Sequence, residues 1–358
     1  MEKEIEHLIH SDEVDSVVLY RLPYKSELEV IIGKSEELIY GVNEQVIARK
    51  GFVFEPFDNV QTKGVFISES YSYSYSYLES GLKSILSSIY ITTQENNYFD
   101  SAYDVYSQQF DRMHHAILDN DLDKVILSRT MRGPSLSGIK VIEFFEELTK
   151  RYPHAFVYAI NTPTSGLWIG AGPELLLKND GKQMETVSLA GTLPNTKEWE
   201  WSNKELEEQQ LVTEYVEDVL LKHQVDDIQE YGPDTIDAGQ VKHLCTSFSF
   251  ESALVNGNHL GLLYELHPTP AVCGMPKEEA HRLILDTEKH DRNFYSGFLG
   301  PVGDRQYEFY VNIRCLEVFK ESSTLFIGGG LTKDSEVKKE WDETELKAET
   351  LLSVLKNI

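Results

Sequence analysis

Residues 263–276 read LYELHPTPAVCGMP. Three prolines and one glycine fall within the nine residues from Pro268 to Pro276, so this backbone has little conformational freedom and predicts a rigid loop. The loop carries His267 and Thr269, and rigid loops that present polar side chains tend to be binding elements. His267 taken alone is equally explained as an ordinary loop histidine. The segment therefore predicts a fixed polar loop set into a larger fold.

Runs typical of short strands lie on both sides of this loop, with helical patterns between them. Helices are predicted at 101–120, 141–151, 203–223, from His281 onward and at 335–356, the last capped by Asp334 or Ser335. Strands are predicted at 17–20, 28–32, 51–54, 124–128, 155–160, 166–170, 174–178, 307–319 and 324–327. Because the strands cluster in hairpins, the pattern indicates an α+β fold with largely antiparallel sheets. The Tyr/Ser repeat at 70–77 fits a strand with one aromatic face or an exposed loop.

Composition excludes several classes of protein. The 358 residues include 33 Lys and Arg against 59 Asp and Glu, a net charge of −26, so neither nucleic acid nor an anionic membrane is an expected partner. No apolar run approaches about 18 residues, and the first six residues are too acidic for a secretory signal. Cys245, Cys273 and Cys315 lie far apart, which favours reduced thiols over a disulfide framework or a zinc site. We expect a cytoplasmic protein.

Two pairs of glutamates have helical spacing. Glu205 and Glu208 lie three apart in one predicted helix, and Glu340 and Glu343 repeat that spacing in the last one. Lys347 follows Glu343 by one turn. Carboxylates from two helices, completed by water, suit an octahedral Mg²⁺ ion. Each pair taken alone is equally a solvated helix face.

Two glycine-rich segments invite comparison with nucleotide loops. Gly170 to Glu174 leads into a strand, not a helix, so it fails the dinucleotide pattern and predicts a bulged hairpin corner. Gly328 to Gly330 follows a predicted strand and precedes a helix. Such a turn lets backbone N–H groups approach an anion, although a simple tight turn explains it as well.

Ten motifs, taken in order, resemble the chorismate-utilising enzymes, and among them the isochorismate synthases. They lie at 124–129, 172–176, 189–192, 205–208, 241–244, 267–274, 291–297, 313–315, 328–331 and 340–344. The resemblance runs from near Tyr103 to the end of the chain. Residues 1–102 carry no matching motif and correspond to a variable first lobe, within one chorismate-binding domain that spans 1–358.

The resemblance implies a fold and a ligand set. It implies two antiparallel sheets packed as a large β sandwich, with peripheral helices and the active site between the sheets. It also implies Mg²⁺, held directly by Glu208 and Glu343 and through water by Glu205 and Glu340. Chorismate carries two carboxylates, one of them bridged to this metal near Lys347. The remaining substrate contacts that it implies are Gly191, Thr192, His243, Thr269, Tyr295, Arg314, Gly329 and Gly330.

The residue at position 124 separates members of the family. Lysine there resembles the water-using isochorismate and salicylate synthases, because water needs a general base, whereas ammonia-using anthranilate and aminodeoxychorismate synthases generally have another residue. Glu174 falls where the family has its general acid. From the residues alone, Lys124 could also be a strand-edge lysine and Glu174 a turn carboxylate. One departure is Gln209, where the family usually has histidine; another is the short stretch between Thr192 and Asn203.

These features predict an isomerase: an isochorismate synthase that converts chorismate to isochorismate for menaquinone or catechol siderophore biosynthesis. The alternatives are a salicylate synthase, which also eliminates pyruvate, an ammonia-using synthase with a glutaminase partner, and a scaffold without turnover. We expect a monomer without a glutaminase subunit.

Overall fold

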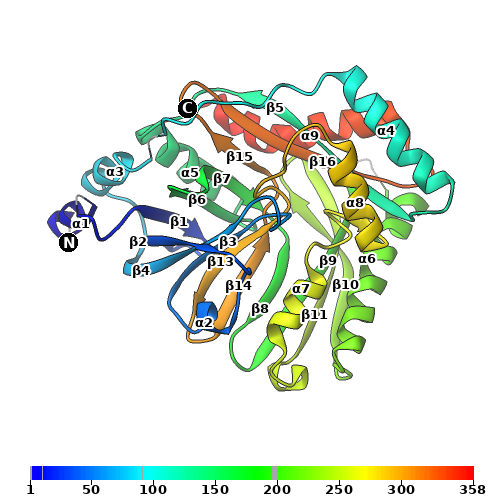
Figure 1. The fold of residues 1–358 in the computed structure, drawn as a ribbon, viewed down its shortest axis with the longest axis horizontal. Coiled ribbons are helices and arrows are strands. Elements are labelled where there is room, and N and C mark those ends of the chain that lie inside the picture. Colours follow the sequence, from blue (N-terminus) through cyan, green and yellow to red (C-terminus); the bar gives the residue numbers. More distant parts are fainter. Residues whose placement is uncertain (1, 10, 91, 196–199) are drawn as a thin grey trace.

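The computed structural model describes residues 2–9, 11–90, 92–195 and 200–358 (Figure 1). Its helices are α1 (Glu2–Ile9), α2 (Glu44–Ile47), α3 (Ser80–Ser87), α4 (Tyr103–Leu118), α5 (Ile139–Arg151), α6 (Asn203–Lys222), α7 (His259–Leu266), α8 (Lys277–Thr287) and α9 (Val337–Leu355), with a 3₁₀ turn at Ser252–Val255. The expected helices are thus present, with ends that differ by a few residues.

The strands of the described residues form one antiparallel ladder. They are β1 (Ser16–Arg21), β2 (Leu28–Leu38), β3 (Gly51–Glu55), β4 (Gly64–Tyr75), β5 (Lys124–Gly133), β6 (Phe156–Thr162), β7 (Gly166–Gly172), β8 (Leu175–Asn179), β9 (Gln183–Pro194), β10 (Gln229–Ala238), β11 (Val241–Glu251), β12 (Gly274–Met275), β13 (Phe298–Gly303), β14 (Gln306–Val311), β15 (Cys315–Val318) and β16 (Ser323–Leu331). Their order is β10-β11-β9-β8-β14-β13-β3-β4-β2-β1-β6-β7-β15-β16-β5-β12. The antiparallel α+β prediction is confirmed.

The two expected sheets are joined into one. Strand β1 pairs with β2 on one side and with β6 on the other, so hydrogen bonds run unbroken from one half of the ladder to the other. The halves still pack face to face: the rings of Phe156 and Tyr310 stack with centroids 4.4 Å apart. A long sheet twists, and this twist lets its halves fold onto each other as the layers of a sandwich. Strands β1 to β4, from the first hundred residues, lie in the middle of the ladder.

Helices cover the outer faces of the sandwich (Figure 1). Helix α5 shows why: Val141, Phe144, Phe145 and Leu148 recur at helical spacing and are all fully buried, so one face of the helix packs on the sheet. Side chains of α1, α3 and α9 join the same core. Helices α6 and α7 pack on the other half of the sheet, and α4 and α8 pack around β5.

Three local expectations were wrong. The predicted strand 307–319 is split into β14 and β15 by residues 312–314, where Arg314 has a φ of 53°. The triple glycine lies inside β16, paired with β5, and does not form a turn before a helix. Helix α9 begins after Glu336, because the Ser335 hydroxyl instead accepts a hydrogen bond from the Thr332 N–H in the preceding turn.

The structure also decides the conformation of the Tyr/Ser repeat and of the Pro173 corner. The Tyr/Ser repeat continues β4 as a strand through Tyr75, with the hydroxyls of Tyr71 and Tyr75 3.2 Å apart on one face. Pro173 and Glu174 form the corner between β7 and β8. Among the described residues, no helix is both long and apolar enough to cross a membrane.

Candidate active site

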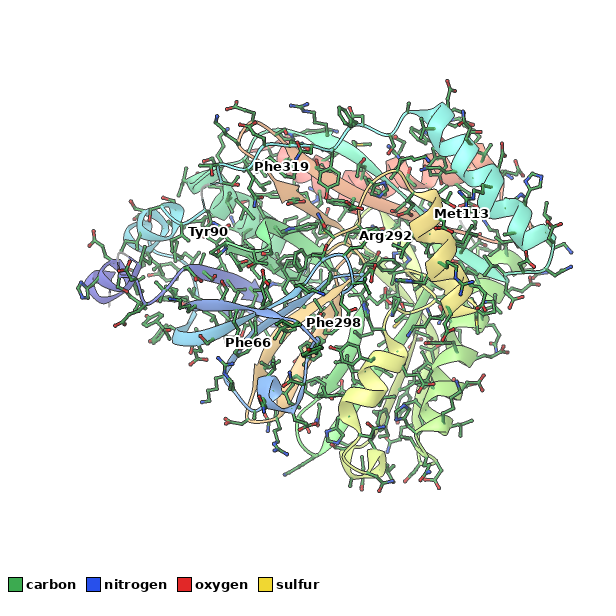
Figure 2. The ribbon with its side chains drawn as sticks, in the orientation of Figure 1. Phe66, Tyr90, Met113, Arg292, Phe298 and Phe319 are labelled. Atoms are coloured by element: carbon green, nitrogen blue, oxygen red, sulfur yellow. The ribbon has the colours of Figure 1, made fainter. Side chains whose placement is uncertain are left out.

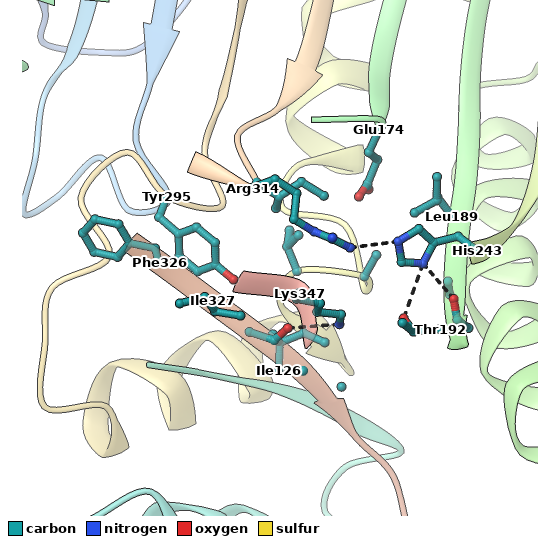
Figure 3. Close-up of a pocket in the computed structure, with 18 of the residues that line it drawn as sticks. Ile126, Glu174, Leu189, Thr192, His243, Tyr295, Arg314, Phe326, Ile327 and Lys347 are labelled. Atoms are coloured by element: carbon teal, nitrogen blue, oxygen red, sulfur yellow. Dashed lines mark hydrogen bonds between the residues drawn. The ribbon is translucent and has the colours of Figure 1, made fainter. Parts of the chain in front are cut away.

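A cavity lies between the two halves of the sandwich (Figure 3), and most of the residues singled out in the sequence line it. Strands β5, β9, β11 and β16 and helices α6 and α9 all reach this cavity, so residues far apart in the chain face one another there. The lining includes Lys124, Glu174, Gly191, Thr192, Glu208, His243, Tyr295, Arg314, Gly329, Gly330 and Lys347.

The glycines of β16 keep one wall of the cavity free of side chains. A Cβ atom on Gly330 would lie 2.9 Å from Glu208 Oε1 and 3.0 Å from Lys124 Cε. A Cβ atom on Gly329 would lie no closer than 3.7 Å to any such neighbour, with Glu340 and Glu343 nearest. A side chain at position 330 would therefore displace the ends of Glu208 and Lys124, so glycine suits this position through close approach and not through a turn.

Arg314 and His243 form a cationic, polar end of the cavity. An Arg314 Nη2–H donates to His243 Nε2 at 2.9 Å, so the ring proton is on Nδ1, which donates to the Gly191 carbonyl at 2.8 Å (Figure 3). Burial and the nearby Arg314 charge hold the pKa of His243 well below its usual range. The imidazole is thus neutral and orients the guanidinium, which suits binding of a carboxylate.

Glu174 is a buried carboxyl with a raised pKa. It is 2% exposed, and burial raises its pKa to about 7. Thr269 Oγ1 donates to Glu174 Oε1 at 3.1 Å. Thr269 itself does not line the wall, but Ala271 and Val272 of the same rigid loop do, so the loop both lines the cavity and holds Glu174. A carboxyl that is half protonated near neutral pH suits a general acid.

Lys124 begins β5 and is 1% exposed, with its Nζ 2.7 Å from Glu208 Oε1. Burial opposes ionisation of Glu208, but the charges of Lys124, Lys347 and Lys204 outweigh it and lower the pKa of this carboxyl. Lys124 and Glu208 therefore form a buried ion pair at the cavity wall. One cavity therefore holds a buried lysine, Lys124, and a carboxyl that can be protonated, Glu174.

Residues 77–356 match the family model described as chorismate binding enzyme. The chain belongs to this family. It is 28% identical over 311 residues to isochorismate synthase EntC of Escherichia coli (strain K12), which covers 84% of this chain and 79% of the relative. It is 31% identical over 257 residues to isochorismate synthase DhbC of Bacillus subtilis (strain 168), covering 67% and 64%.

The fold has a counterpart in a solved structure. The structure of MenF, the menaquinone-specific isochorismate synthase from Escherichia coli, superposes with a TM-score of 0.79 at 18% identity. The superposition covers 98% of this chain and 91% of that one, so it includes the first hundred residues.

In this chorismate-binding enzyme, three of the four expected metal ligands gather beside Gly329 and Gly330. Each contacts a lysine: Glu208 pairs with Lys124 at 2.7 Å, Glu340 with Lys204 at 3.0 Å, and Glu343 with Lys347 at 2.7 Å. Burial and then the charge of Glu343 raise the pKa of Glu340. Among the described residues, no three acidic, histidine or cysteine side chains are arranged as a ready metal site.

The chemistry of this cluster nevertheless fits a divalent cation. The three carboxylates supply the oxygen donors that Mg²⁺ prefers, and Glu340 is 2% exposed, so its charge needs a nearby cation. Lysines meet that need in the arrangement described. Family membership is consistent with a metal-dependent enzyme.

Glu205 lies apart from the other three glutamates. Its carboxylate accepts a hydrogen bond from the Ser202 N–H at 3.0 Å, within a capping box that begins α6. Its side chain is therefore engaged at the helix end. Lys204, which the sequence reasoning overlooked, points to Glu340 instead; its spacing of four from Glu208 was the available signal.

The departure at Gln209 has a structural role. Its side chain is 2% exposed, its Oε1 accepts from the Ala190 N–H at 2.8 Å, and its Nε2 donates to the Ser188 carbonyl at 3.2 Å. Gln209 thus fixes α6 to β9 directly before Gly191. The other departure concerns the stretch between Thr192 and Asn203, part of which, residues 196–199, lies outside the described residues.

The apolar side of the cavity was not predicted. Its residues include Ile126, Leu189, Phe326, Ile327, Ala348 and Leu351. Ile126 lies two residues after Lys124 on the same strand face, and Leu351 lies one helical turn after Lys347, so spacing could have identified both. Arg292 supports this side from behind, donating to the carbonyls of Val272 and Ile126 at 2.8 and 2.9 Å.

Proposed function

We propose that this chain is an isochorismate synthase. It would convert chorismate to isochorismate by adding water at C2 with loss of the C4 hydroxyl, an isomerisation, and would supply menaquinone or catechol siderophore biosynthesis. The observation that carries the proposal is that Lys124 and Glu174 line one cavity together with Arg314, in a chain of the chorismate-binding enzyme family.

Substrate binding follows from the charges around the cavity. Arg314, oriented by neutral His243, would hold one carboxylate of chorismate by charge-assisted hydrogen bonds. Tyr295, Gly191 and Thr192 line the cavity and would complete the contacts, with backbone N–H groups near Gly329 and Gly330. The glycine wall leaves room for the ring.

Proton transfer would use the two buried titratable groups. Glu174, with a pKa of about 7, retains a proton near neutral pH and would protonate the departing C4 hydroxyl. Lys124 would take a proton from the attacking water. Its ammonium is paired with Glu208 in the arrangement described, so this role requires Glu208 to exchange Lys124 for another cation.

Mg²⁺ would be that cation. Glu208, Glu340 and Glu343 would hold it, with Glu205 the weaker candidate because its carboxylate caps α6. When bound, the ion supplies positive charge for the second carboxylate of the substrate. Lys347 contacts Glu343 at 2.7 Å and donates to the Gly328 carbonyl at 3.1 Å. It would lie beside that substrate carboxylate.

The organisation of the protein is part of the proposal. We infer a single chorismate-binding domain over 1–358, in which residues 1–102 form its first lobe. The protein would act as a cytoplasmic monomer, without a glutaminase subunit.

One incubation tests the activity. The purified chain is mixed with chorismate and MgCl₂, and the products are separated by liquid chromatography. Isochorismate without salicylate supports the proposal. Enzyme-dependent salicylate would instead indicate a salicylate synthase, and anthranilate or aminodeoxychorismate formed only with added ammonium would indicate an ammonia-using enzyme. No product under any condition would contradict a catalytic role.

A further inference from the structure

A second and larger cavity lies outside the candidate active site. Its volume is about 820 Å³, and its walls come from the segment before α4, the end of β15 and the segment after α8. Phe319, labelled in Figure 2, lies where β15 ends and lines this cavity. None of the residues assigned above to chorismate or Mg²⁺ lines it.

A buried carboxyl without a partner lines this cavity. Glu317 is 6% exposed, and its Oε2 has no hydrogen-bond partner among the residues that the structure describes. Burial raises its pKa to about 8. A buried polar atom without a partner is costly, and native proteins rarely retain one unless a ligand or water satisfies it.

The charges around Glu317 favour a cationic ligand. Glu95, Asp100 and Asp291 also line the cavity, and Lys289 is the one lysine or arginine among the described lining residues. Lys320 offsets part of the charge of Glu95, at 3.5 Å. His290 adds no positive charge at neutral pH, because burial lowers its pKa. The cavity is therefore net acidic.

Aromatic rings give the cavity an apolar wall. Tyr98 and Phe319 both line it, with ring centroids 5.9 Å apart. Rings beside a carboxyl suit an organic ammonium, because the carboxylate pairs with the charge and the ring faces attract it further.

We propose that this cavity binds a small organic amine with an apolar body, whose ammonium group pairs with Glu317 and whose body lies against Tyr98 and Phe319. A bound amine would influence the candidate active site through contacts between aromatic rings. Phe326, which lines that site, packs edge-on against Tyr98 with centroids 5.3 Å apart and stacks on Tyr295 at 5.6 Å.

The test uses 2-phenylethylammonium as the probe, titrated into the full chain by calorimetry at about pH 9, above the pKa of about 8 that burial gives Glu317. We expect saturable binding, weakened by at least about tenfold in Glu317→Gln, because the variant keeps the shape of the side chain but loses the charge-assisted bond. Glu55→Gln is the matched control: Glu55 is 2% exposed and has an unpartnered carboxylate oxygen among the described residues, but it does not line this cavity. The Glu55→Gln variant should bind 2-phenylethylammonium with the affinity of the unmodified protein.

A second variant, at an exposed position, tests the same cavity in case Glu317→Gln does not fold. Asn97 is exposed and lines the cavity, so Asn97→Trp should fold and weaken probe binding by occupying part of the space. Equal binding of 2-phenylethanol or 3-phenylpropanoate would overturn the proposal, because recognition would not depend on a cation. No binding to the unmodified protein, or full affinity in both variants, would overturn it as well.

Discussion

The ammonium nitrogen of Lys124 lies 2.7 Å from a carboxylate oxygen of Glu208 at the wall of the active-site cavity. Lys124 is proposed as the base and Glu208 as a metal ligand. Neither residue can take its proposed role while the two are paired with each other. A cation that takes Glu208 would free Lys124, so the pair links metal binding to acid–base chemistry.

Removal of Lys124 should remove the general base. We expect Lys124→Ala to lose isochorismate formation by about 10²–10⁴-fold, the usual contribution of a positioned proton transfer. The rate is measured with saturating chorismate and MgCl₂, and chorismate affinity is measured separately and should be largely kept. A rate within about threefold of the unmodified enzyme would exclude Lys124 as base, since it lies far below that contribution.

The pKa of Glu174 predicts a pH dependence. The acid must carry its proton, and its pKa is about 7, so the turnover number should fall on the alkaline side of about pH 7, by roughly tenfold per pH unit. Glu174→Ala should lose most activity, while Glu174→Gln should lose both activity and this alkaline limb. The measurement is a pH profile with saturating substrate; an unchanged limb in Glu174→Gln would assign it to another group.

The glycines of β16 permit a matched pair of variants. In Gly330→Ala, the new methyl group would lie 2.9 Å from Glu208 Oε1, so we expect a large loss of turnover with the fold retained. Gly329→Ala places its methyl group no closer than 3.7 Å to these neighbours and does not approach the Lys124–Glu208 contact, so it should lose less turnover than Gly330→Ala. Chorismate turnover and thermal melting are measured for both; equal activity would show that close approach at Gly330 is unimportant.

Glu343 is expected to be essential for the metal. Glu343→Gln should abolish Mg²⁺-dependent turnover and weaken Mg²⁺ binding measured directly by calorimetry, with a normal melting curve. Glu349→Gln, on the same helix, is the control, because among the described residues Glu349 pairs with Lys356 at 3.1 Å and neither residue lines the cavity. Retained activity and an unchanged Mg²⁺ requirement in Glu343→Gln would mean that the cluster is a charged surface.

Glu55 should make the protein less stable at alkaline pH. Burial raises its pKa from 4.5 in the unfolded chain to about 8 in the fold. The proton is therefore bound more tightly in the folded state, and the stability this contributes is lost as pH rises through about 8. Glu55→Gln should raise the free energy of unfolding at pH 9 by up to about a few kcal/mol relative to the unmodified protein, which is measured as a higher melting temperature. The gain should be smaller at pH 5.

Sequence reasoning succeeded where the information is local. A short run rich in branched residues predicted the first half of β5, and the helix expected at 203–223 matches α6 to within one residue, because both signals depend on local geometry. It failed at Gly328 to Gly330, since a glycine run reads as a turn unless the pairing of β16 with β5 is known. It failed likewise at the break between β14 and β15, where Arg314 has a φ of 53° and its side chain contacts His243 and Thr350 from distant segments.

What the sequence alone determined is the chemical inventory: the lysine at 124, the carboxyls at 174, 208, 340 and 343, and the arginine at 314, in an order that marks the family. Only the tertiary structure decided which of these meet. Glu208 pairs with Lys124, while Glu205, one turn away on the same helix, caps its own helix end. The reason is physical: contacts between distant segments depend on how strands register and fold onto one another, and no local pattern encodes that geometry.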